Sequence, residues 1–146
     1  MSFSTDTPIS RNPSCEEETM NSNRIKIMVL DDEPIVCKRL KPALEKQGYE
    51  VDAFTQSSEA MEQLKQVEYD IIITDLKMKG IDGMQLLGEA KRRSPKTEVI
   101  VITGFATMET AKESFHKGVF DFIAKPFKLS EIQEVVNRAE AKIRRS

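Results

Sequence analysis

The chain has 146 residues, which is enough for one compact domain and too few for two of ordinary size. Its 22 basic and 24 acidic side chains nearly cancel, which argues against a protein that binds nucleic acid through bulk positive charge. Two cysteines and one histidine cannot complete a four-ligand zinc site or a disulfide framework. The apolar runs are far shorter than the ~20 residues of a membrane span, and the polar N-terminus lacks the apolar segment of a signal peptide. We therefore expect a cytoplasmic protein without direct contacts to nucleic acid or membrane.

The first part of the chain differs in composition from the rest. Residues 1–23 are rich in Ser, Thr, Asn and Pro, contain few large apolar side chains and show no periodicity. A segment of this kind cannot bury enough apolar surface to offset the entropy that ordering it would cost. We predict that residues 1–23 form a flexible leader and that residues 24–146 form the folded domain.

From residue 24 onward, short apolar runs alternate with segments of helical periodicity. The first run ends at Asp31 and Asp32, and Pro34 follows where the first turn of a helix tolerates proline. Pro42 lies inside that helix and is expected to kink it, because proline removes one backbone donor. The strands expected in chain order are 25–30, 49–53, 70–74, 99–102 and 119–124.

Each expected strand is followed by a helix with an apolar stripe. Thr107 is expected to cap the fourth helix, and Ser130 with Gln133 matches a capping box for the last. The expected inward faces include Ile35, Val36, Leu40 and Leu44 in the first helix and Met108, Ala111 and Phe115 in the fourth.

Strands that are separated by helices must run parallel, and strands that are apolar on both faces need helices on both sides of the sheet. A closed barrel would need eight such units and at least ~200 residues. The sequence therefore predicts an α/β fold: a five-stranded parallel sheet with helices on both faces, which is a flavodoxin-like (βα)5 three-layer sandwich.

Polar side chains end four of the five expected strands: Asp31 and Asp32, then Asp75, Thr103 and Lys125. Open parallel sheets bind ligands at the carboxyl ends of their strands, so these side chains should share one edge. Two carboxylates ~4 Å apart repel by about 4 kcal/mol at an effective dielectric of ~20, so the three must take up a proton or hold a cation. An oxygen-only site suits Mg²⁺ or Mn²⁺, and an aspartate can act as a nucleophile toward phosphorus. The set predicts metal-assisted phosphoryl transfer onto a carboxylate.

Four stretches between residues 24 and 146 together resemble the receiver domains of two-component response regulators, the group that includes chemotaxis regulators. Any one stretch would be weak evidence, but all four occur in the order and spacing of the family. They are Val29–Pro34, Ile73–Met78 with Asp82 and Gly83 downstream, Val101–Gly104, and Phe120–Phe127.

The resemblance implies that Asp75 accepts a phosphoryl group from the phosphohistidine of a sensor histidine kinase or of a histidine phosphotransfer protein. It also implies a Mg²⁺ site made by Asp31, Asp32, Asp75 and the backbone carbonyl of Lys77. Such a protein is a switch rather than an enzyme, because its only chemistry is to gain and lose one phosphoryl group.

Further roles follow from the same resemblance. Thr103 would hydrogen-bond the phosphoryl group, Lys125 would pair with it, and the bond before Pro126 would be cis. Phe122 occupies the aromatic switch position, which turns inward as Thr103 moves toward the phosphate. This movement would remodel the face made by the fourth helix, the fifth strand and the fifth helix, where an unidentified downstream target or a second copy would dock. A phosphorylation-dependent homodimer is the expectation that follows.

The sequence departs from the family pattern beside the site. Lys79 stands four residues after Asp75, where receivers usually have proline. Lys77 and Phe105 occupy the positions at which the family tunes hydrolysis of its aspartyl phosphate, and both are large. We predict a phosphoryl lifetime longer than that of a fast chemotaxis-type regulator.

Two other functions are compatible with parts of this pattern. A Mg²⁺-dependent phosphohydrolase with an aspartate nucleophile would need a second acidic residue two positions after Asp75, but Lys77 stands there. A receiver-like docking scaffold that no longer takes phosphate would not need the full set of site residues, which are Asp31, Asp32, Asp75, Thr103 and Lys125. Both functions are less well supported than the phosphorylated switch.

Overall fold

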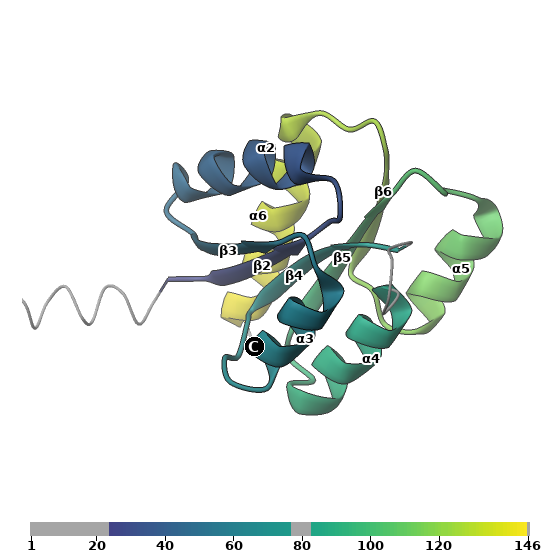
Figure 1. The fold of residues 1–146 in the computed structure, drawn as a ribbon, viewed down its shortest axis with the longest axis horizontal. Helices are drawn as coiled ribbons and strands as arrows, with labels where there is room; N and C mark the ends of the chain where they lie inside the picture. Colours follow the sequence, from purple (N-terminus) through teal and green to yellow (C-terminus); the bar gives the residue numbers. More distant parts are fainter. Residues whose placement is uncertain (1–23, 77–82, 146) are drawn as a thin grey trace, which may run out of the picture.

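The computed structural model describes residues 24–76 and 83–145. Its strands are β2 (Lys26–Leu30), β3 (Glu50–Phe54), β4 (Ile71–Asp75), β5 (Glu98–Thr103) and β6 (Asp121–Ala124). They form one sheet in the order β3-β2-β4-β5-β6, and every neighbouring pair is parallel (Figure 1). The predicted five-stranded parallel sheet is confirmed. No helix in the described ranges has the length and apolar character that crossing a bilayer requires.

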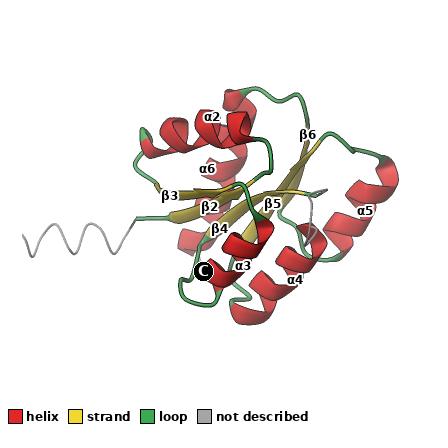
Figure 2. Cartoon of the chain, viewed as in Figure 1, coloured by secondary structure: helices red, strands yellow, loops and turns green. Residues whose placement is uncertain are grey.

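Helices alternate with the strands and cover both faces of the sheet. They are α2 (Pro34–Glu45), α3 (Ser57–Leu64), α4 (Gly83–Arg93), α5 (Met108–His116) and α6 (Leu129–Arg145). Helices α2 and α6 lie on one face, and α3, α4 and α5 lie on the other (Figure 2). Each face has its own apolar cluster, because strand side chains alternate between the two sides. The three-layer sandwich is therefore confirmed.

The apolar stripe of α2 is narrower than the sequence predicts. Val36, Cys37, Leu40 and Leu44 are buried against the sheet, as helical spacing requires. Ile35 was expected beside them, but 61% of its surface is exposed. The first turn of α2 therefore presents an aliphatic side chain to solvent next to the carboxyl edge of the sheet.

Helix α5 packs against the edge strand β6 through small side chains. Ser114 is buried and Ala111 is partly buried. Met108 and Phe115 were expected to face the core, but they are 75% and 49% exposed. The expected cap is confirmed, because the Thr107 hydroxyl accepts a hydrogen bond of 3.0 Å from the backbone N–H three residues later.

The start of α6 differs from the expected capping box. The helix begins at Leu129, so Ser130 lies inside it and cannot cap it with Gln133. The carboxylate of Glu131 instead accepts a hydrogen bond of 2.8 Å from the backbone N–H of Lys128. An ionised acceptor at a helix N-terminus is favoured by both the free N–H groups and the helix dipole, so Glu131 fulfils this role.

Candidate functional site

The sheet register brings the predicted site residues to one edge. Leu30 of β2 pairs with Thr74 of β4, so Asp31 and Asp75, one residue further along each strand, are neighbours. In the sheet, β3 lies on one side of β2, whereas β4, β5 and β6 follow on the other side. The strand order therefore reverses between β2 and β4. Such a reversal of strand order opens a crevice at the carboxyl ends of the strands.

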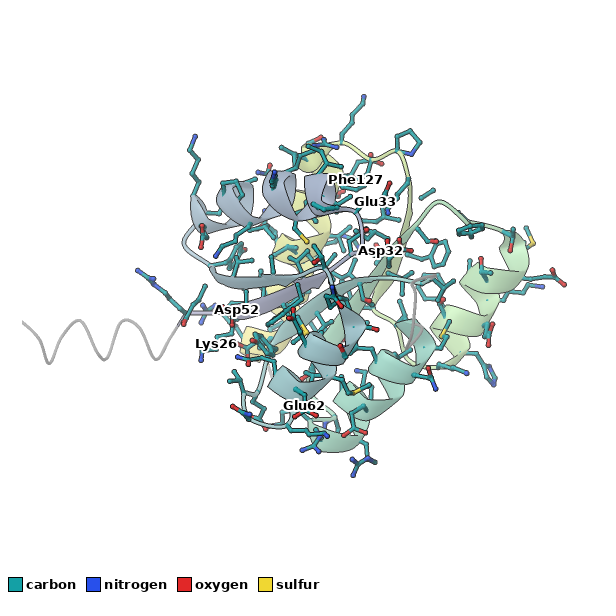
Figure 3. All side chains as sticks on the ribbon, viewed as in Figure 1. Lys26, Asp32, Glu33, Asp52, Glu62 and Phe127 are labelled. Carbon is teal, nitrogen blue, oxygen red and sulfur yellow. The ribbon has the colours of Figure 1, made fainter. Side chains whose placement is uncertain are left out.

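Three carboxylates converge in this crevice. One oxygen from each of Asp31, Asp32 and Asp75 lies within 4.8 Å of the other two. Asp31 and Asp75 are buried, whereas Asp32 and the adjacent Glu33 are exposed at the carboxyl ends of the strands (Figure 3). The three aspartates therefore lie together, and their role as metal ligands stays a prediction.

Lys125 at the end of β6 completes the cluster. Its Nζ lies 2.7 Å from Asp31 Oδ2, 2.7 Å from Glu33 Oε1 and 3.0 Å from Asp75 Oδ2. Burial alone would lower the pKa of Lys125, but its hydrogen bonds to these carboxylates outweigh burial and raise the pKa above its ordinary value. The ammonium of Lys125 therefore stays charged.

The two carboxylate oxygens of Asp31 have different surroundings. Its Oδ1 accepts a hydrogen bond of 2.8 Å from the backbone N–H of Glu33. Its Oδ2 is fully buried and has no well-formed hydrogen bond within the described ranges, although Lys125 Nζ is close. Burial raises the pKa of Asp31, while Lys125 and the Glu33 amide oppose that shift. Three clustered carboxylates, two of them buried, suit a hard divalent cation, so this acidic cluster could hold one.

Thr103 and Phe122 lie on the two strands beyond β4. Thr103 is fully buried at the end of β5, and its hydroxyl accepts a hydrogen bond of 3.0 Å from the Phe105 backbone N–H. The Lys125 N–H donates to the Thr103 carbonyl at 2.8 Å, and the Lys125–Pro126 peptide bond is cis, as the resemblance implies. Phe122 is partly buried against the apolar cluster under α3 and α4. Lys77, the fourth predicted metal ligand, lies outside the described residues.

The sequence analysis gave Glu33 no part in the site. The available signal was an acidic side chain two residues after Asp31, at the position that precedes a helix. Acidic residues are common near helix N-termini, where the helix dipole favours them, so Glu33 did not stand out. Only the folded chain brings it to Lys125, which is 92 residues away in sequence.

Comparison with known proteins agrees with this geometry. Residues 27–137 match the family model of the response regulator receiver domain. Regulatory protein AtoC of Escherichia coli (strain K12) is 33% identical over 114 residues, which are 78% of this chain but 25% of AtoC. The chain therefore spans about a quarter of the length of this relative.

Solved structures are similar as well. A response regulator receiver domain protein from Clostridium thermocellum is 31% identical with a TM-score of 0.75, and the match covers 81% of this chain and 95% of that one. The beryllofluoride-activated NtrC4 receiver domain dimer is 30% identical with a TM-score of 0.76, and the match covers 81% and 98%. The chain therefore belongs to the family of response regulator receiver domains, which are signalling modules.

Proposed function

We propose that the chain is a phosphorylated switch in which Asp75 accepts a phosphoryl group from a histidine kinase or a histidine phosphotransfer protein. The observation that carries this proposal is the position of Asp75: its carboxylate lies in a cluster with two further aspartates, and its Oδ2 is 3.0 Å from Lys125 Nζ. The family match does not favour the phosphohydrolase alternative. The cytoplasmic location expected from the sequence stays a prediction.

Asp31, Asp32 and Asp75 would hold Mg²⁺, and Mn²⁺ has the same oxygen preference. The backbone carbonyl of Lys77 stays a predicted fourth ligand. When bound, the ion would neutralise the clustered carboxylates and the phosphoryl oxygens that approach them.

The transfer itself needs little from the protein beyond position and charge. An oxygen of the Asp75 carboxylate attacks phosphorus, the bond between phosphorus and the donor atom breaks, and its electron pair leaves with the donor. Lys125 would then pair with a phosphoryl oxygen, and the Thr103 hydroxyl would donate to another. The hydroxyl can donate while it still accepts from the Phe105 N–H, so a shift of Thr103 toward the phosphoryl group would either draw the Phe105 backbone along or break that hydrogen bond.

The shift of Thr103 toward the phosphoryl group would start the conformational change that passes the signal on. Phe122, which is only partly buried, would turn inward as Thr103 shifts, and the face made by α5, β6 and α6 would change. Exposed Met108 and Phe115 on α5 supply apolar surface to that face. A downstream target or a second copy would dock there, and a solved relative is described as a beryllofluoride-activated dimer.

The test uses the whole chain with acetyl phosphate, a small phosphoryl donor. In the presence of Mg²⁺ we expect the intact mass to rise by one phosphoryl group, and light scattering should report an increase in dimer. A metal chelator should prevent both changes. If the wild-type chain gains no phosphate in Mg²⁺, the proposal is wrong.

The lifetime of the phosphoryl group is a separate prediction. Phe105 is 60% exposed beside Thr103, so its ring can obstruct water that approaches the phosphoryl group on Asp75. Phe105→Ala should therefore shorten the lifetime severalfold, which the decay of labelled phosphate would measure. Loss from the wild-type chain within seconds would contradict the prediction, and so would an unchanged rate in the variant.

A further inference from the structure

Glu33 has a side chain that the local fold does not need. It occupies the N-cap position of α2, yet it makes no capping hydrogen bond. Its backbone N–H is satisfied by Asp31, and its side chain is 58% exposed. The carboxylate reaches across the crevice instead, and its Oε1 accepts a hydrogen bond of 2.7 Å from Lys125 Nζ.

Lys125 therefore has two kinds of acidic partner. Asp31 and Asp75 belong to the three-carboxylate cluster that could hold a cation, whereas Glu33 lies outside that cluster. The ammonium and a divalent cation would neutralise the same two buried carboxylates, so they compete for them. Because Glu33 shares Lys125 with these two carboxylates, it would weaken the hold of Lys125 on Asp31 and Asp75.

We propose that Glu33 is a positioning residue that competes with Asp31 and Asp75 for Lys125, so that these two carboxylates bind a cation more readily. The same ion pair then competes with the phosphoryl group for Lys125. Glu33 thus favours metal binding and opposes capture of the phosphoryl group. This inference rests on the proposed function, because it assigns Lys125 to the phosphoryl group.

Glu33→Gln should change the affinities for Mg²⁺ and for a phosphoryl analogue in opposite directions, whereas a loss of folding would weaken both. In Glu33→Gln, Lys125 would pair more closely with Asp31 and Asp75, so Mg²⁺ should bind more weakly. With Mg²⁺ saturating, Lys125 would be freer to pair with a phosphoryl analogue, so the analogue should bind more tightly. An exposed ion pair is weak, so we expect changes of roughly 1.4- to fivefold in each affinity.

The experiment measures two affinities on the whole chain. Calorimetry gives the Mg²⁺ affinity without a phosphoryl analogue, and then the beryllofluoride affinity at saturating Mg²⁺. Glu45→Gln is the matched control, since it removes a similar exposed ion pair, with Lys41 at 3.1 Å, from the other end of α2. We expect Glu33→Gln to show weaker Mg²⁺ binding and tighter beryllofluoride binding, and Glu45→Gln to match the wild type in both.

A second comparison tests whether Glu33 acts through Lys125. If it does, adding Glu33→Gln to a Lys125→Met chain should leave the Mg²⁺ affinity unchanged, because that chain lacks the lysine through which Glu33 acts. This comparison completes a double-mutant cycle. An effect that persists without Lys125 would overturn the inference, and so would two affinities that move in the same direction or do not move. A wild-type chain that binds Mg²⁺ but not beryllofluoride would contradict the proposed function, while the Mg²⁺ comparisons would still test Glu33.

Discussion

Asp75→Asn is expected to abolish the gain of a phosphoryl group from acetyl phosphate in Mg²⁺. The amide has nearly the shape of the carboxylate but lacks the anionic oxygen that attacks phosphorus. The substitution also removes one of three clustered negative charges, so the free energy of unfolding without metal should not fall. Intact mass after incubation measures the first effect, and urea denaturation measures the second.

Asp52→Asn is the matched control for this substitution. Asp52 lies in β3, where its carboxylate accepts a hydrogen bond of 2.6 Å from the Tyr69 hydroxyl, and it is not part of the acidic cluster. This variant should take up phosphate as the wild type does. An Asp75→Asn chain that still gained one phosphoryl group would place the acceptor at another residue.

The fold follows from the sequence because its strands are short, apolar and regularly spaced. Ile71, Ile72 and Ile73 are completely buried, which is what a strand covered by helices on both faces requires. The site follows for the same reason: a polar residue at the end of a buried strand must lie at the carboxyl edge of a parallel sheet. Asp31 and Asp75 therefore become neighbours whatever their side chains do.

Features that depend on side-chain direction were harder to predict. The spacing of Met108 and Phe115 fits an inward stripe, but α5 lies beside an edge strand and buries Ser114 instead. The contact between Glu33 and Lys125 joins two long side chains that are far apart in the sequence, so no local sequence pattern predicts it. Local pattern thus locates backbone elements, whereas tertiary packing decides which long side chains meet.

Gly83 gives the largest expected loss of stability that also affects the site. It begins α4, and its N–H donates to the Leu76 carbonyl at 3.0 Å. A Cβ at this position would overlap the backbone carbonyl oxygen of Asp75 and lie 3.0 Å from Leu76 Cα. Neither group can rotate away as a side chain could, so Gly83→Ala must displace the backbone that carries Asp75.

Gly83→Ala should lower the free energy of unfolding by about 1–3 kcal/mol, as overpacking does, and should slow phosphorylation because Asp75 moves relative to Lys125. Gly88→Ala in the same helix is the control: a Cβ there meets no atom within 4 Å, so the gain in helix propensity should stabilise the chain by about 0.5–1 kcal/mol. Urea denaturation and the phosphorylation rate would measure both variants. If both substitutions changed the free energy of unfolding in the same direction, the close approach of α4 to the Asp75 backbone would not constrain the site. If Gly83→Ala lowered it and Gly88→Ala raised it, this contact would hold the phosphoacceptor in position.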